Sequence, residues 1–155
     1  MEFSIHFRET DMKMSQFIVA ALGYGAALAI AAPQCTQQTT RGDWGFTCEG
    51  ELPAGGASLR SLGTCTASRT AFWDCTATVN LGGQLVPQEL HGQAQNNADC
   101  TGTITYEQSL GGQPAGQLKI NYVIFDQGDA IKGLPTNSGG VLACSLKRIN
   151  RSDDH

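Results

Sequence analysis

Few residues of this 155-residue chain have the types and spacing that hydrolytic chemistry requires. A Ser-His or Cys-His nucleophile needs a histidine base, and beyond residue 31 the chain offers only His91 and the terminal His155. Neighbouring strand residues point to opposite faces, so an inward Leu90 would leave His91 in water. Neither G-x-S-x-G nor H-E-x-x-H occurs in the sequence. We therefore predict no catalytic residues.

Two carboxylates, Asp126 and Asp129, flank Gly128. Glycosidase chemistry would need such a pair about 5 to 9.5 Å apart across a cleft. The local sequence instead indicates a hairpin turn, in which Asp is a common residue. A weak Ca²⁺ site is the alternative, because oxygen ligands in a loop are sufficient for that ion. Turn formation is the better explanation, so we predict no metal and no cofactor.

Six cysteines are the other reactive group, and all of them follow residue 31: Cys35, Cys48, Cys65, Cys75, Cys100 and Cys144. No C-x2-C spacing occurs, so a zinc site has no support. An even number of cysteines in an exported chain indicates disulfides. We predict up to three bridges, with all of the roughly 15 possible pairings open.

Aromatic residues form the one set that could bind a ligand: Trp44, Phe46, Trp73, Tyr106, Tyr122 and Phe125. A barrel of about eight strands either fills its interior with side chains or holds one small ligand. Tyr122 and Phe125 have opposite phases in one strand, so at most one of them faces inward. We select Trp44, Phe46, Trp73 and Tyr122 as ligand-binding residues, with simple core packing as the alternative.

The elements that must position these side chains are strands. Apolar residues recur with period two and not with helical spacing, and Gly recurs at short intervals. The pattern predicts strands around Trp44–Cys48, Ser58–Thr66, Trp73–Val79, Leu85–Ala94, Thr101–Glu107, Gln117–Phe125, Ala130–Leu134 and Val141–Arg148.

Turn signals rich in Gly and Asn separate these strands, for example Leu81–Gln84, Gly111–Pro114 and Asn137–Gly140. Gly and Asn tolerate the positive φ of tight hairpins, and short connections favour antiparallel neighbours. We predict an all-β fold, an antiparallel up-and-down barrel of about eight strands stabilised by disulfides. A β-sandwich is the alternative.

The apolar run Phe17–Ala32 follows Lys13 and contains no charge. It is short for a membrane span and ends in a small-x-small site, as in a signal peptide. We expect a leader over residues 1–31, translation starting at Met12 or Met14, and cleavage after Ala31. One secreted β domain, residues 32–155, would follow, extracellular and without a membrane anchor.

The formal net charge of −4 and the scattered basic residues argue against a nucleic-acid partner. Asn150 begins an N-x-S sequence, so we predict it as a glycosylation site in a eukaryotic host. We expect the protein to be a monomer.

Several short motifs carry a resemblance: Gly42–Gly50 (GDWGFTCEG), Asp99–Ile104 (DCTGTI), Tyr122–Gly128 (YVIFDQG) and Gly140–Arg148 (GVLACSLKR). They resemble a group of small exported proteins of unknown function, common in bacteria, with G-x-Y-G-F-x-C-x-G and D-C-T-G-T motifs. The similarity covers about Arg41–Ile149. The leader resembles those of filamentous fungi, which would make this a fungal secreted relative. The resemblance implies a lipocalin-like barrel.

Three function classes follow. The first is a secreted, non-enzymatic β protein that binds a small apolar ligand or an extracellular host or surface partner, as an effector would. The second is a barrel enzyme, either a cyclase or isomerase that works by shape or a hydrolase on the rim. The third is a structural component of the cell wall. Without a catalytic motif, the sequence favours the first.

Overall fold

The structure is a computed structural model that describes residues 34–52 and 56–151. The predicted leader, its start and its cleavage site lie outside these residues. Within them, no helix is long and apolar enough to span a bilayer.

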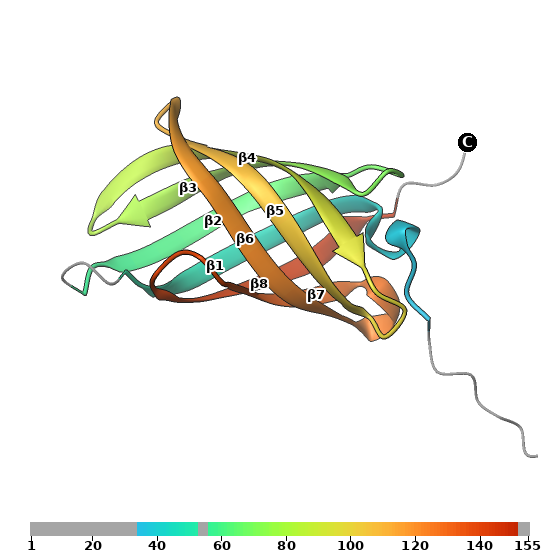
Figure 1. The fold of residues 1–155 in the computed structure, drawn as a ribbon. Coiled ribbons are helices and arrows are strands. Elements are labelled where there is room, and N and C mark those ends of the chain that lie inside the picture. The colour runs from blue at the N-terminus through green and yellow to red at the C-terminus, as the bar shows by residue number, and fades with distance from the viewer. Residues whose placement is uncertain (1–33, 53–55, 152–155) are drawn as a thin grey trace, which may run out of the picture. The chain divides into compact units, whose positions relative to one another are not determined.

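Eight antiparallel strands form one closed barrel in which each strand pairs with its neighbours in sequence and β1 pairs with β8 (Figure 1). The strands are β1 (Gly42–Glu51), β2 (Ser58–Ala67), β3 (Phe72–Leu81), β4 (Gln84–Asn96), β5 (Thr101–Leu110), β6 (Gln113–Phe125), β7 (Ala130–Pro135) and β8 (Val141–Asn150). The predicted up-and-down barrel is thus confirmed, and the sandwich alternative is wrong.

The largest shift of a single strand end is in β6, which begins at Gln113 and not at Gln117. Its first residues pair with the end of β5, with a register shift between Glu107 and Ser109. Gly116 adopts a φ of 84° opposite this shift, a conformation that Gly reaches without steric cost. The turn signal at Gly111 and Gly112 therefore makes a tighter hairpin than we predicted, and Gln113 and Pro114 belong to the strand.

The inward faces of the strands follow the predicted alternation. In β6, Ile120, Tyr122 and Ile124 are buried, while Phe125 is 44% exposed. Two inward glycines make room for tyrosine rings: an added Cβ would lie 2.6 Å from Tyr106 Cδ1 at Gly92 and 2.4 Å from Tyr122 Cζ at Gly102. Larger residues at these glycines would displace the rings from the interior.

Three disulfides join the six cysteines: Cys35–Cys100, Cys48–Cys144 and Cys65–Cys75. Cys48 lies opposite Cys144 across the β1–β8 seam, and Cys65 lies opposite Cys75 between β2 and β3. The prediction that all six cysteines form disulfides is confirmed, and the structure fixes the pairing. Three bridges indicate an oxidising environment.

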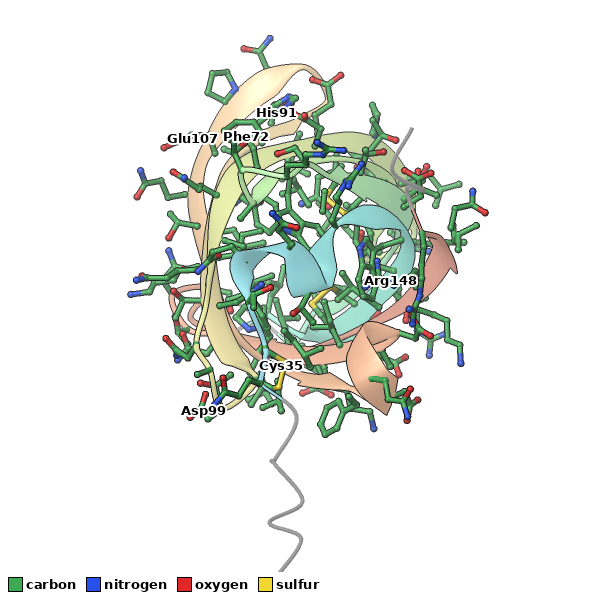
Figure 2. All side chains as sticks on the ribbon, turned by 90° about the vertical axis from the view of Figure 1, so that its right-hand side faces the viewer. Cys35, Phe72, His91, Asp99, Glu107 and Arg148 are labelled. Atoms are coloured by element: carbon green, nitrogen blue, oxygen red, sulfur yellow. A yellow bond between two sulfur atoms is a disulfide. The ribbon has the colours of Figure 1, made fainter. Side chains whose placement is uncertain are left out.

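The two ends of the barrel differ. The 3-10 helix η1 (Gln37–Thr40) precedes β1 and lies across one end, where the C-terminal end of β8 also lies (Figure 2). Cys35 ties this segment to the β4–β5 turn through Cys100. We call this the closed end. The opposite end, where the β3–β4, β5–β6 and β7–β8 connections lie, carries no such helix among the described residues, and we call it the open end.

Candidate functional site

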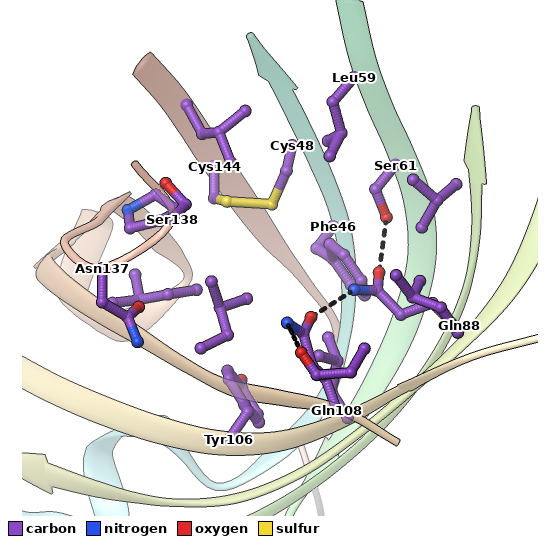
Figure 3. Close-up of a pocket in the computed structure, with 18 of the residues that line it drawn as sticks. Phe46, Cys48, Leu59, Ser61, Gln88, Tyr106, Gln108, Asn137, Ser138 and Cys144 are labelled. Atoms are coloured by element: carbon purple, nitrogen blue, oxygen red, sulfur yellow. Dashed lines mark hydrogen bonds between the residues drawn. A yellow bond between two sulfur atoms is a disulfide. The ribbon is translucent and has the colours of Figure 1, made fainter. Parts of the chain in front are cut away.

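A cavity of about 410 Å³ occupies the open half of the barrel (Figure 3). Residues at the open ends of the strands line it, among them Leu52, Leu81, Leu110 and Leu142. Its volume lies within the range of about 300 to 1,000 Å³ that is usual for small-molecule sites. This interior is therefore large enough for one small ligand.

The cavity exists because the inward side chains of β2 and β3 are small. The inward positions of β2 from the open end are Leu59, Ser61, Gly63, Cys65 and Ala67. Val79 and Leu81 of β3 face the same space. Across the barrel, β6 lines the cavity with Ala115, Gln117, Leu118 and Ile120. Ser61 and Val79 are too short to reach this opposite wall, so the space between the walls stays unfilled.

Charge is missing from the described part of the cavity wall. The described lining residues include no Asp, Glu, Lys, Arg or His. Tyr106 is an ionisable lining residue, and burial raises the pKa of its hydroxyl above its ordinary value, so it stays neutral. The cavity therefore presents a neutral surface to any ligand.

A chain of polar side chains crosses one wall of the cavity (Figure 3). Ser61 Oγ donates to Gln88 Oε1 at 3.3 Å, and Gln88 Nε2 donates to Gln108 Oε1 at 3.3 Å. Gln108 Nε2 in turn donates to the Ala115 carbonyl at 3.2 Å. The chain places two amides among aliphatic neighbours, an arrangement that can orient a ligand.

The mouth of the cavity is shaped by the β7–β8 loop. Strand β7 ends at Pro135, so β6 loses its strand partner beyond Ile120 on that side. Asn137 takes the place of the missing strand, since its Oδ1 accepts from Lys119 N at 2.7 Å and its Nδ2 donates to the Gln117 carbonyl at 2.9 Å. This pair of hydrogen bonds holds the loop against β6, and Asn137 itself lines the cavity.

Of the four residues that we selected for ligand binding, only Phe46 lines the cavity. Trp44, Trp73 and Tyr122 are buried in the closed half, and the two indole rings lie 5.8 Å apart. Trp44 Nε1 donates to the Thr40 carbonyl of η1 at 2.8 Å. These three side chains therefore fill one half of the barrel, while the other half remains hollow.

Gln88 and Gln108 were not among the residues that we selected from the sequence. Gln88 precedes Leu90 by two positions, and Gln108 follows Tyr106 by two, so both share the inward phase of buried residues. A polar residue on the apolar face of a strand is unusual and calls for an explanation. The inward phase of Gln88 and Gln108 within the predicted strands was the signal that could have identified them.

The side chain of Arg148 joins several segments at the closed end. Its guanidinium carbon lies 4.3 Å from the centre of the Trp44 ring. It donates to the carbonyls of Thr39, Arg41 and Gly128 and pairs with Asp129 at 2.9 Å. Burial lowers its pKa, while Asp129 opposes that effect. A planar guanidinium group stacked over an indole ring is a favourable cation–π geometry.

Tyr122 and Asn96 join the barrel to η1. Tyr122 donates through its hydroxyl to Asn96 Oδ1, and Asn96 Nδ2 donates to the Thr36 carbonyl at 2.8 Å. Asn96 N and the Gln37 side chain add a reciprocal pair of hydrogen bonds. The closed end is thus filled by packed side chains that are hydrogen-bonded to η1.

The remaining sequence candidates lie on the outside. His91 is exposed and its Nδ1 lies 2.7 Å from the exposed carboxylate of Asp74 (Figure 2 shows His91 on the outside of the barrel). Asp126 begins a short 3-10 turn, η2 (Asp126–Gly128), and Asp129 follows it, in agreement with the predicted turn. Among the described residues, no cluster of three or more His, Cys, Asp or Glu side chains could hold a metal ion. Asn150 is exposed at the end of β8.

No protein-family model and no curated protein matches this chain. Among solved structures, a redesigned β-barrel bound to DFHBI is similar to it, with 16% sequence identity and a TM-score of 0.48. The similarity covers 72% of this chain and 97% of that chain. A likeness this distant says nothing about the function of this chain.

Proposed function

We propose that this protein is an exported, non-enzymatic binding module that holds one small apolar ligand in the cavity of its open half. The observation that carries the proposal is the cavity of about 410 Å³ with its mostly aliphatic, uncharged wall. Burying apolar ligand surface there contributes about 25 cal/mol per Å² before the costs of association are subtracted. Three disulfides are consistent with export.

The other function classes have less support. His91 lies on the outer surface and faces Asp74 rather than the cavity, which argues against a hydrolase. A cyclase that works by shape would need groups to move protons, and the described cavity wall carries no His or carboxylate. Binding to an extracellular partner and a structural role in a cell wall stay predictions.

A fluorescent probe tests the proposal. The full chain, produced in a host that forms its disulfides, should bind the neutral dye N-phenyl-1-naphthylamine with a rise in fluorescence. Ser61→Phe fills the cavity from β2 and should weaken binding about tenfold or more. Leu118→Phe fills it independently from the opposite wall, β6, and should do the same.

Leu62→Phe is the matched control, because Leu62 follows Ser61 and is 67% exposed on the outer face. It should leave the dissociation constant unchanged. Circular dichroism of each variant confirms that the barrel is intact. Equal binding by the wild type and both filled variants would place the dye elsewhere and contradict the proposal.

A further inference from the structure

The hydrogen-bonded chain from Ser61 to Ala115 has a fixed direction. The Ala115 carbonyl can only accept, so the atom of Gln108 that faces it is the nitrogen. Gln108 Oε1 therefore faces Gln88 and accepts from Gln88 Nε2. Gln88 Oε1 is left to accept from Ser61, the hydroxyl that completes the chain. One backbone carbonyl thus sets the orientation of both amides.

This direction leaves donors available at the cavity wall. A primary amide carries two N–H groups, and Gln88 and Gln108 each donate one of theirs within the chain. The second N–H of each has no acceptor among the described residues. The existing bonds of 3.2 to 3.3 Å are long, so they cost little to rearrange. Each amide therefore keeps one N–H donor for a ligand, beside the second lone pair of its oxygen.

The charge of a suitable ligand follows from the rest of the wall. An anion that leaves water needs a cation or several strong donors to replace its hydration. The described cavity lining has no Lys, Arg or His. A carboxylate would therefore lose more than the two amides return, whereas a neutral carbonyl oxygen needs only one or two N–H donors.

We propose that the cavity selects an uncharged, largely apolar ligand with a carbonyl-type oxygen, which accepts hydrogen bonds from Gln88 and Gln108. This inference rests on the proposed ligand-binding function and names the class of ligand. Ser61 and Ala115 act as positioning groups, because they hold the amides in the donating orientation.

Competition with the dye tests the ligand class. Three competitors of equal chain length should be compared: an alkane, a methyl ketone and a carboxylate at a pH well above its pKa. We expect the ketone to displace the dye at about tenfold lower concentration than the alkane, and the carboxylate to be weaker than the ketone.

Variants assign the effect to the amides. Gln88→Met and Gln108→Met keep the length of the side chain but remove its N–H donors, so the ketone should lose its advantage while the alkane is unaffected. Gln93→Met is the matched control, since Gln93 lies on the same strand as Gln88 but is exposed on the outer face.

The outcomes separate this inference from the proposed function. If the dye binds but the ketone and alkane compete equally, or both variants leave the ketone unchanged, the ligand class is wrong and the binding function stands. A carboxylate that competes as well as the ketone also overturns the ligand class. If neither the dye nor any competitor binds, both proposals fail.

Discussion

At the closed end of the barrel, Trp44, Trp73 and Tyr122 fill the interior, and Arg148 and η1 cover them. At the open end, the same eight strands carry mostly Leu, Val, Ser, Cys and Gln on their inward faces, with Phe46 and Tyr106 as the aromatic lining residues, and leave a cavity. The backbone is closed and antiparallel in both halves, so side-chain size makes the difference. The packed closed half stabilises the fold, so the open half can remain hollow.

The means of stabilisation differ as well. The closed end is held by aromatic packing and by a polar network in which η1, β4, β6 and β8 all take part. The open half has fewer packing contacts to lose, and the Cys48–Cys144 disulfide on its wall ties the first strand to the last. An empty interior lacks the dispersion contacts of a packed core, and a disulfide can replace part of the stability that is lost.

The largest expected effect comes from removing that cross-link. Cys48 and Cys144 are 96 residues apart in sequence, against 10 for Cys65 and Cys75. The loop-entropy estimate gives about 4 to 5 kcal/mol for the first bridge and about 3 kcal/mol for the second. We therefore expect the Cys48→Ala, Cys144→Ala double variant to lose more unfolding free energy than the Cys65→Ala, Cys75→Ala variant.

Urea denaturation followed by circular dichroism measures both losses. The Cys48→Ala, Cys144→Ala variant should also bind the dye more weakly, because the β1–β8 seam forms part of the cavity wall. Equal losses in the two variants would show that the seam is held by its backbone pairing and not by the disulfide.

Matched truncations at the two ends should have unequal costs. Trp44 is fully buried, so Trp44→Ala should lower the unfolding free energy by about 3 to 5 kcal/mol. Leu59 is partly exposed and lines the cavity, so Leu59→Ala enlarges an existing space and should cost about 1 kcal/mol. Denaturation midpoints measure the two costs, and similar values would contradict the division into a packed half and a hollow half.

The barrel was predictable because the period-two pattern and the Gly and Asn turns are local signals. Phe125 and Tyr122, with opposite phases, were assigned correctly on that basis alone. The disulfide pairing was not predictable, since it depends on register: Cys48 meets Cys144 only because β1 closes on β8.

The position of the cavity was not predictable for a related reason. Phase tells which side chains point inward but not at which height they lie, and strand stagger sets the height. Trp44 and Phe46 share one phase, yet only Phe46 reaches the cavity. The sequence also draws attention to large aromatic residues as ligand-binding candidates, whereas the cavity here depends on smaller residues such as Ser61 and Val79.

The smallest expected effect concerns the response of the closed end to acid. Asp129 pairs with Arg151 at 2.8 Å and with Arg148 at 2.9 Å. The hydrogen bond from Arg151 is the largest cause that holds the pKa of Asp129 below its ordinary value of 3.8. A carboxylate with a lowered folded-state pKa stabilises the fold above its unfolded-state pKa, and this contribution is lost as the pH falls through the folded-state value.

Asp129→Asn should therefore lower the melting temperature at neutral pH by a few degrees at most, because Asp129 is partly exposed to solvent. The difference from the wild type should shrink as the pH falls below about 4 and then vanish. Asp126→Asn, in the same turn at a φ of 51° that Asn tolerates, is the matched control for replacing a turn Asp by Asn. Dye binding should not follow the titration of Asp129, because the described cavity wall carries no charged residue. A binding curve that shifts together with the melting temperature of Asp129→Asn would show that the two halves of the barrel are coupled.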